Sequence, residues 1–471
     1  MLPFLADKAS SERAAVAGAR TKSLSLSVLR RNFAELHPAL SADEATAAAA
    51  RCLYCYDAPC TRACPTRIDI PGFIRQILQR DTPGAARTIL DANIFGGSCA
   101  RVCPTEVLCE GACVANTLLD APVEIGRLQR YACDDASEAS LDFYEPGTPT
   151  GRRVAIVGAG PAGLTCAHEL RKRGHAVDLF EAGEVAGGLN TLGIAAYKMT
   201  TEFALSEVER VLRLGAELRL RSPIDGGRLA ALLEEYHAVL LAVGMGRTCP
   251  LEIPGENLAG VREALEFIYQ THTRSFDKCA VGNAVVVIGG GNTAIDAANA
   301  AARLGAARVT LAYRRDAESM PAFRHEYELA LASGVQALWN ARPTRILGRG
   351  GKVTGVRMQR VRMEGRGRKA RLKPVHGSDF TLPCDMVIRA LGQELLLDFL
   401  RSIPKLKLTR AGRVKIDPKT HATSVARLFA CGDCEQDAGE EVVYAVESGK
   451  RAARGIDALL AAAPREAPAS A

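Results

Sequence analysis

Eight of the chain's 15 cysteines fall between Cys52 and Cys113, in two groups of four. The two groups read Cys52-x2-Cys55-x4-Cys60-x3-Cys64-Pro65 and Cys99-x3-Cys103-Pro104-x4-Cys109-x3-Cys113. Four thiolates hold one cubane cluster, so eight predict two [4Fe–4S] centres. Zinc is an alternative, but zinc sites usually show two Cys-x2-Cys pairs, and this region has one. Disulfides are the third alternative.

A glycine-rich motif, Gly158-Ala159-Gly160-Pro161-Ala162-Gly163, follows the apolar run Val154–Val157. In such a motif the first glycine allows a tight turn and the second lets the backbone approach a pyrophosphate. The third glycine lets the following helix pack close to the strand. The helix N-terminus then offers N–H groups to the phosphates, and Glu181, at the end of the next strand, can accept hydrogen bonds from ribose hydroxyls. The motif predicts a dinucleotide site.

A second motif, Gly289-Gly290-Gly291-Asn292-Thr293-Ala294, repeats this pattern after the run Ala284–Ile288. The position after its second strand carries Arg314 and Arg315 instead of an acid. Two guanidinium groups suit a 2′-phosphate, which favours NADP(H) over NAD(H). The adjacent Asp316 leaves NAD(H) open.

Both motifs require strand–helix–strand units to position them. Apolar periodicity predicts a helix over Leu164–Arg173 and a strand over Ala176–Phe180 after the first motif. It predicts a helix over Ala294–Leu304 and a strand over Val309–Tyr313 after the second. The cysteines lie between short helical stretches at Pro71–Gln79 and Gly84–Asp91.

Composition limits the class of protein. No apolar run is long enough to span a membrane, and the start of the chain lacks the pattern of a secretory signal, so we expect a cytoplasmic protein. Thiols stay reduced in that compartment, which favours metal or redox chemistry. A net charge of +7 over 471 residues does not indicate nucleic-acid binding.

Further segments resemble the two-dinucleotide flavoproteins that include glutathione and thioredoxin reductases. They are Gly187-Gly188-Leu189, Leu240–Gly244, Leu428–Asp433 and Val442–Ala445. The resemblance implies that the first motif binds FAD. It adds Gly188, Leu189, Gly432 and Asp433 to the flavin site and places a helix containing Val443 toward the flavin ring. Lys198, in Ala195-Ala196-Tyr197-Lys198, is the candidate to cover that ring.

The stretches Cys99–Glu106 and Ala121–Arg130 resemble the electron-input subunit of bacterial dihydropyrimidine dehydrogenase. In that family a glutamine in a Gly-x-Leu-Gln segment ligates one cluster, and Gln129 occupies this position. The resemblance implies that one cluster is held by Cys52, Cys55, Cys60 and Cys113. It implies that the other is held by Cys64, Cys103, Cys109 and Gln129, with Cys99 left free.

The resemblance implies that the chain passes electrons from NAD(P)H through FAD and the clusters to an FMN-containing partner subunit that reduces uracil or thymine. With no counterpart of the pyrimidine-reducing barrel, the chain alone is expected to reduce artificial acceptors only. The small subunit of NADPH-dependent glutamate synthase is similar throughout, and Tyr313–Asp316 looks more like that subunit. A zinc-stabilised, non-catalytic scaffold is a third interpretation.

The expected fold class is α/β, with a helical iron–sulfur domain before two Rossmann-like domains. The predicted ranges are an N-terminal extension (1–45), a double [4Fe–4S] domain (46–138), a flavin domain in two parts (152–275 and 391–465) and an inserted NAD(P) domain (276–390).

Overall fold

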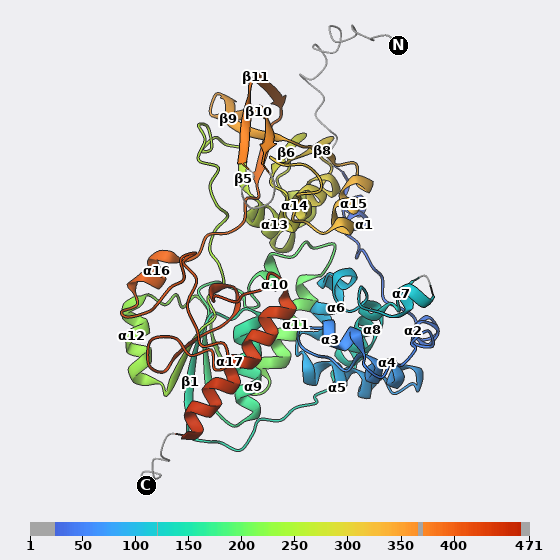
Figure 1. The fold of residues 1–471 in the computed structure, drawn as a ribbon, viewed down its shortest axis with the longest axis vertical. Coiled ribbons are helices and arrows are strands. Elements are labelled where there is room, and N and C mark those ends of the chain that lie inside the picture. The colour runs from blue at the N-terminus through green and yellow to red at the C-terminus, as the bar shows by residue number, and fades with distance from the viewer. Residues whose placement is uncertain (1–23, 120, 366–370, 463–471) are drawn as a thin grey trace. The chain divides into compact units, whose positions relative to one another are not determined.

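The computed structural model describes residues 24–119, 121–365 and 371–462. By their internal contacts these residues divide into two compact units (Figure 1). The large unit comprises Ala34–Cys249 and the chain from Gly392 onward. The small unit comprises Pro250–Leu391 and the described residues up to Phe33. Residues 1–23 of the expected N-terminal extension lie outside the described residues.

The large unit begins with a helical region that contains both cysteine groups. Its elements are α2 (Ala42–Ala49), α3 (Pro59–Ala63), α4 (Ile70–Leu78), α5 (Thr82–Ala92), α6 (Gly96–Val102), the 3₁₀ turn η1 (Thr105–Val107), α7 (Ala115–Leu118) and α8 (Ile125–Glu138). Helices α2, α4, α5 and α8 share one apolar core, in which Phe73, Ile89 and Leu128 are fully buried. This core fixes the segments that carry the thiols.

Two helices of this region begin with the same four-residue pattern. Asp69 caps α4 by accepting a hydrogen bond from Gly72 N at 3.1 Å, and Asp81 caps α5 by accepting one from Gly84 N at 3.0 Å. In both, proline occupies one of the first two helical positions, where a missing N–H costs nothing. The Asp-x-Pro-Gly pattern therefore sets both helix starts.

The rest of the large unit is built on a five-stranded parallel sheet with strand order β13-β4-β1-β2-β3. Its strands are β1 (Arg153–Val157), β2 (Ala176–Phe180), β3 (Glu217–Arg219), β4 (Ala238–Leu241) and β13 (Leu428–Ala430). Its helices are α9 (Pro161–Lys172), α10 (Leu189–Leu192), α11 (Thr201–Leu212), α12 (Gly226–Glu235), α16 (Leu397–Ser402), the 3₁₀ turn η4 (Gly432–Cys434) and α17 (Val442–Ala462).

Both faces of this sheet are covered, as expected for a doubly wound fold. Val154 and Ile156 of β1 pack into the core formed with α9, α11 and α17. The alternate residues Ala155 and Val157 pack into the core beneath α12 and α16. Figure 1 shows these two helix layers on opposite sides of the strands.

The small unit contains a second parallel sheet, with strand order β5-β12-β6-β7-β8, and an antiparallel sheet of order β11-β10-β9. Its strands are β5 (Val261–Glu263), β6 (Ala284–Ile288), β7 (Arg308–Ala312), β8 (Gln336–Leu338), β9 (Ala341–Arg349), β10 (Lys352–Glu364), β11 (Arg371–Pro383) and β12 (Met386–Arg389). Its helices are α1 (Leu26–Asn32), α13 (Ala264–Thr273), the 3₁₀ turn η2 (Phe276–Lys278), α14 (Asn292–Arg303) and α15 (Arg324–Ala332). The Phe33 ring stacks on Phe276 at 4.3 Å between centroids.

The predicted strands Ala176–Phe180 and Ala284–Ile288 match β2 and β6. The helices α9 and α14 begin two to three residues earlier than predicted, because each starts directly on its glycine turn. None of the helices within the described ranges is long and apolar enough to cross a membrane.

Candidate cofactor sites

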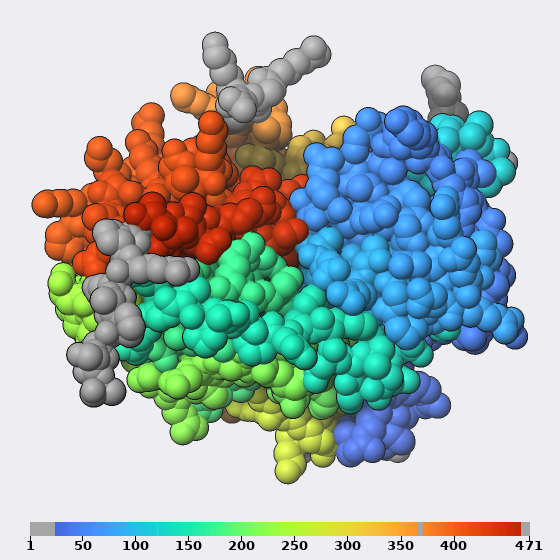
Figure 2. Space-filling model, turned by 90° about the horizontal axis from the view of Figure 1, so that it is seen from below, coloured from blue at the N-terminus to red at the C-terminus, as the bar shows by residue number. Residues whose placement is uncertain are grey.

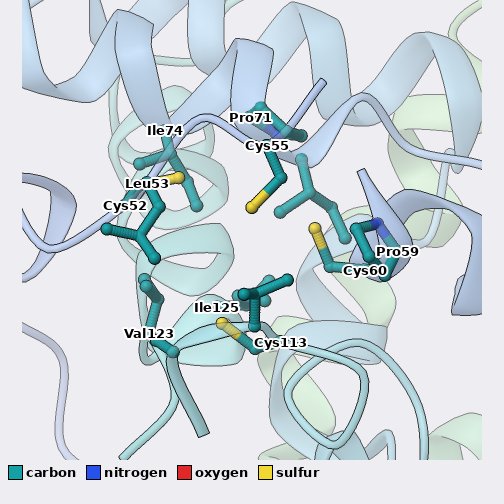
Figure 3. Close-up of a pocket in the computed structure, with 13 residues that line it drawn as sticks. Cys52, Leu53, Cys55, Pro59, Cys60, Pro71, Ile74, Cys113, Val123 and Ile125 are labelled. Atoms are coloured by element: carbon teal, nitrogen blue, oxygen red, sulfur yellow. The ribbon is translucent and has the colours of Figure 1, made fainter. Parts of the chain in front are cut away.

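Four thiols of the cysteine-rich region, those of Cys52, Cys55, Cys60 and Cys113, line one pocket of the large unit. Figure 3 shows their sulfur atoms facing this pocket from the turn after α2, from helix α3 and from the loop before α7. Although Cys113 is distant in sequence, it joins the first cysteine group here. The structure thus brings together the four residues that the resemblance assigns to one cluster.

The shape of this pocket bears on which metal it suits. Among the described residues, no three His, Cys, Asp or Glu side chains are grouped closely enough to hold a single metal ion. The thiols instead surround a space whose remaining walls are apolar, including Leu53, Ile74 and Val123. Four thiols set around an open apolar space fit a cubane cluster better than a zinc ion, which draws its ligands to one point.

Burial favours the protonated form of two of these thiols, Cys52 and Cys60. Burial raises the pKa of Cys60 to about 11, and the neighbouring Cys113 and Cys52 add to this effect. Burial also raises the pKa of Cys52. Because metal ligands must be thiolates, loading this site releases protons.

Cys64, Cys103 and Cys109 form a second group. The interaction of the protonated Cys103 thiol with Cys99, and then burial, raise the pKa of Cys103 well above its usual value, with Cys109 and Cys64 as further neighbours. Burial raises the pKa of Cys109, and Cys64 and Cys60 are among its neighbours. The Cys64 sulfur lies 3.3 Å from the Thr66 hydroxyl oxygen. The structure therefore places Cys99 with the three expected thiols.

Gln129, on α8, is 7% exposed. Its Nε2 donates a hydrogen bond to the carbonyl oxygen of Gly96 at 2.7 Å. Within the described part of the chain, no donor hydrogen-bonds to its Oε1. This bond orients the amide and leaves its oxygen available as a ligand, which is the arrangement an amide-ligated cluster requires.

The first glycine motif has the geometry of a pyrophosphate-binding turn. Gly158 has a φ of 106°, and a Cβ there would lie 2.3 Å from the Ala242 carbonyl oxygen. A Cβ on Gly163 would lie 2.1 Å from the Gly158 oxygen, so any larger residue at this position would push α9 away from the turn. A Cβ on Gly160, in contrast, would meet nothing within 4 Å. Open space lies where a phosphate would approach the N-terminus of α9, which begins with Pro161 and Ala162.

Glu181 lies at the end of β2 beside this turn. Its carboxylate accepts hydrogen bonds from Ala159 N at 2.9 Å and from Gly183 N at 2.8 Å. A Cβ on Gly188 would lie 3.2 Å from Gly160 Cα, so the segment carrying Gly188 and Leu189 crosses directly over the motif. The predicted flavin residues from three segments therefore meet at one edge of the sheet.

The C-terminal segment reaches the same place. A Cβ on Gly432 would lie 3.0 Å from the Ala162 Cβ. Burial raises the pKa of the next residue, Asp433, to about 6, opposed by Arg413. Val443, in the first turn of α17, is buried and belongs to the core of the helical region. The adjacent Tyr444 lies close enough to Cys103 for that thiol to raise its pKa, after burial and Glu441.

Lys198 occupies a half-buried turn between α10 and α11, where its backbone N donates to Ala195 O at 2.8 Å. Its role at the flavin stays a prediction.

The second glycine motif repeats this geometry in the small unit. A Cβ on Gly289 would lie 2.2 Å from the Ala390 carbonyl oxygen, whereas one on Gly291 would meet nothing within 4 Å. Gly290 lies against the Tyr313 ring. The Asn292 side chain is already used, since its Oδ1 accepts a hydrogen bond from Phe323 N at 3.0 Å. Thr293 follows it in the first turn of α14.

Arg314 and Arg315 follow β7, at the edge where this motif opens. Arg314 is exposed, and Arg315 is half-buried with a buried Nε that has no hydrogen-bond partner within the described residues. Asp316 has a local partner, because its Oδ1 accepts a hydrogen bond from Ser319 N at 2.9 Å; Ser319 and, to a smaller extent, the charge of Arg315 lower its pKa. Neither guanidinium forms a salt bridge within the described residues, so both can bind an anion at this edge.

Sequence reasoning missed a buried carboxylate between the helical region and the flavin-binding part. Glu207 of α11 is fully buried. It accepts hydrogen bonds from Gly97 N at 3.0 Å, from Ser98 N at 3.2 Å and from the Ser98 hydroxyl. Asn190, next to Leu189, donates to the same hydroxyl at 2.9 Å. The sequence did contain a signal for it, because Glu207 falls at a position where the periodicity of α11 predicts an apolar residue.

Residues 152–449, more than half of the chain, match the family described as pyridine nucleotide-disulphide oxidoreductase. The chain belongs to this family. Residues 29–141 match the family described as dihydropyrimidine dehydrogenase domain II, 4Fe-4S cluster. The chain is therefore an NAD(P)H-dependent oxidoreductase, in which a helical 4Fe-4S domain precedes an FAD- and NAD(P)-binding oxidoreductase domain.

Two kinds of curated relative are about equally similar to this chain. The NAD-dependent dihydropyrimidine dehydrogenase subunit PreT of Escherichia coli K12 is 34% identical over 423 residues, 90% of this chain and 96% of that protein. The glutamate synthase [NADPH] small chain of Azospirillum brasilense is 34% identical over 460 residues, 93% of this chain and 94% of that one. Overall identity therefore does not separate the two functions.

Solved structures share the fold of the oxidoreductase part. Mycobacterium tuberculosis FprA in complex with NADPH gives a TM-score of 0.54 at 19% identity, over 66% of this chain and 84% of that one. Lactococcus lactis thioredoxin reductase gives 0.52 at 21% identity, over 66% of this chain and 99% of that one.

Proposed function

We propose that the chain is the electron-input subunit of a dihydropyrimidine dehydrogenase. It takes reducing equivalents from NAD(P)H and delivers them to an FMN-containing partner subunit, which reduces uracil or thymine to the 5,6-dihydro form. Gln129 is the residue that favours this function over that of a glutamate synthase subunit. Its buried amide, held by Gly96 with the oxygen left without a donor, supports the three-cysteine-plus-glutamine ligand set of that family.

The proposal includes FAD in the large unit, NADP(H) in the small unit and two [4Fe–4S] clusters. Together these groups supply the conversion of a two-electron hydride donor into single electrons. The pocket of Cys52, Cys55, Cys60 and Cys113 holds the first cluster, and Cys64, Cys103, Cys109 and Gln129 hold the second. We place this chemistry in the cytoplasm, where the thiols stay available.

The position of α17 supports an order for the two clusters. Its first turn contains Val443, which packs into the core of the helical region, and Tyr444, which lies beside Cys103. Farther along α17, Lys450 Nζ donates hydrogen bonds to Ala92 O at 2.6 Å and to Thr66 O at 3.4 Å. These bonds tie the helix to the end of α5 and to the segment after Cys64. Figure 2 shows the red C-terminal helix against the blue helical region. The second cluster therefore lies on the flavin side, and the first lies farther out.

The residues of the flavin site bind and orient rather than react. The turn at Gly160 and the N-terminus of α9 receive the pyrophosphate, and Glu181 faces the ribose. The N-terminus of α17 directs its positive end toward the ring and favours negative charge there. Hydride transfer between stacked rings needs no side-chain acid or base, so positioning is the protein's contribution.

A second candidate is the small subunit of an NADPH-dependent glutamate synthase. Arg314 and Arg315 favour it, because they suit NADPH, whereas the PreT relatives are named as NAD-dependent.

The deciding experiment is anaerobic purification of the chain with its partner from the native host, followed by assays of the complex. We expect NAD(P)H oxidation that depends on uracil, and an FMN-containing partner. Oxidation that instead requires glutamine and 2-oxoglutarate would replace the proposal with the second candidate.

A further inference from the structure

A fourth thiol accompanies the second cysteine group. Cys99 lies one helical turn before Cys103, since Cys103 N donates to the Cys99 carbonyl oxygen at 3.0 Å. Cys99, Cys64 and Cys109 are all neighbours of the Cys103 thiol. Cys99 is only 3% exposed. Four thiols thus gather where the proposed assignment uses three.

Gln129 and Cys99 are both connected to the short helix α6. The Gln129 amide is held by Gly96, the first residue of α6, and Cys99 is three residues farther along α6. A glutamine oxygen is a neutral, hard ligand, whereas a thiolate is soft and negatively charged and is preferred by iron–sulfur clusters. A buried thiol on the helix to which the weaker ligand is hydrogen-bonded is a candidate to displace that ligand.

We propose that Cys99 can replace Gln129 as the fourth ligand of the second cluster, so that this cluster has two alternative ligand sets. The proposal rests on the cluster assignment made under the proposed function. In the exchange, the bond from iron to the Gln129 amide oxygen breaks and a bond from iron to the Cys99 sulfur forms. The thiol proton leaves to water, and no electron is gained or lost.

The exchange has a defined consequence for electron transfer. Thiolate ligation adds one negative charge to the site, and added negative charge makes a cluster harder to reduce. The glutamine-ligated form therefore accepts electrons more readily than the Cys99-ligated form. The Cys99-ligated form, once reduced, passes its electron on more readily. The choice of ligand therefore sets how readily electrons pass from the flavin side toward the first cluster.

The test compares Gln129→Ala with the double variant Gln129→Ala/Cys99→Ser. Iron and acid-labile sulfide are counted per chain, and electron paramagnetic resonance spectra are recorded after anaerobic reduction. We expect Gln129→Ala to keep the wild-type iron content, with the reduction potential of one cluster shifted to a more negative value. The double variant should lose about half of its iron.

Cys133 provides the matched control, because it is a buried thiol one turn after Gln129 on α8, and its sulfur also lies near Gly96. Gln129→Ala/Cys133→Ser should keep its iron. Cys99→Ser alone should also keep its iron and flavin, which shows that the substitution does not prevent folding.

Loss of half of the iron from Gln129→Ala alone, or equal iron in Gln129→Ala and the double variant, would overturn the exchange. The wild-type count tests the underlying assignment separately. About eight irons per chain support two clusters, whereas about four would refute the second cluster and the exchange with it.

Discussion

Arg314 and Arg315 lie just after the carboxyl end of β7. Within the described residues, neither guanidinium forms a salt bridge with an acidic side chain. Each hydrogen bond to a charged group contributes about 1.5–3 kcal/mol. The double change Arg314→Ala/Arg315→Ala removes two such interactions and should therefore lower kcat/KM for NADPH by at least roughly a hundredfold, while kcat/KM for NADH changes little. Steady-state reduction of ferricyanide with each nucleotide measures both values.

Arg324→Ala is the matched control, since Arg324 is an exposed arginine of the same unit, paired with Glu328 on α15. It should leave the nucleotide preference as it is. A double variant that still prefers NADPH would show that these arginines do not read the 2′-phosphate.

Asp433 gives a pH dependence with a definite sign. Its pKa in the folded chain is about 6, above the unfolded value of 3.8, because burial disfavours the charged form. The folded state thus binds this proton more tightly, so the associated stability is present at low pH and is lost as the pH rises through about 6. In flavin-free protein at pH 7, Asp433→Asn should raise the free energy of unfolding by up to about 3 kcal/mol.

Thermal unfolding of flavin-free wild type and Asp433→Asn, followed between about pH 4 and pH 8, checks this prediction. The two curves should converge toward pH 4, separate as the pH rises to about 6, and keep a constant difference above it. The exposed neighbour Asp437→Asn should follow the wild type, and a difference for Asp433→Asn that stays the same from about pH 4 to pH 8 would refute the role of burial.

Glu207 connects two helices, because its carboxylate on α11 accepts hydrogen bonds from the first turn of α6. Glu207→Ala would leave the N–H groups of Gly97 and Ser98 without their acceptor, and each buried unsatisfied group costs about 1–3 kcal/mol. We expect a loss of about 3 kcal/mol or more in unfolding free energy, together with faster release of iron. Thermal unfolding and iron release to a chelator measure these two effects.

Glu209→Ala on the exposed face of the same helix is the control and should change neither quantity. If Glu207→Ala lowers stability without changing iron release, α6 does not depend on this carboxylate for its position.

The strand–helix–strand units could be predicted because their signals are local. Apolar runs before Gly158 and Gly289 set the strands, and the glycines set the turns. The grouping of Cys113 with Cys52 depends on how α2, α4 and α8 pack, which no local pattern encodes; only family resemblance predicted it. Cys99, which that resemblance had left free, lies beside Cys103 for a local reason, because α6 places the two residues one helical turn apart. Glu207 was missed because its partners come from a segment about 110 residues away.

At the scale of the whole molecule, electrons must leave through a surface, and exposed apolar side chains lie on the segments that form the first thiol pocket. Tyr56, Leu53 and Leu118 are exposed by 105%, 45% and 66%. Leu53 lines the pocket, and Arg51 binds the carbonyl oxygens of Ala121 and Pro122, which brings the two segments together. Apolar side chains clustered on a surface commonly mark a protein interface.

We therefore expect the electron-accepting subunit to dock beside the first cluster. Tyr56→Glu/Leu118→Glu should weaken the complex at least tenfold, because it places charges in an apolar contact, while ferricyanide reduction by the isolated chain stays within about twofold. Affinity measured by titration of the purified partner, together with partner-dependent NAD(P)H oxidation, provides the test. Leu220→Glu, an exposed leucine after β3 in the same unit, should bind as wild type does. Unchanged affinity of the double variant would place the electron exit on another face of the molecule.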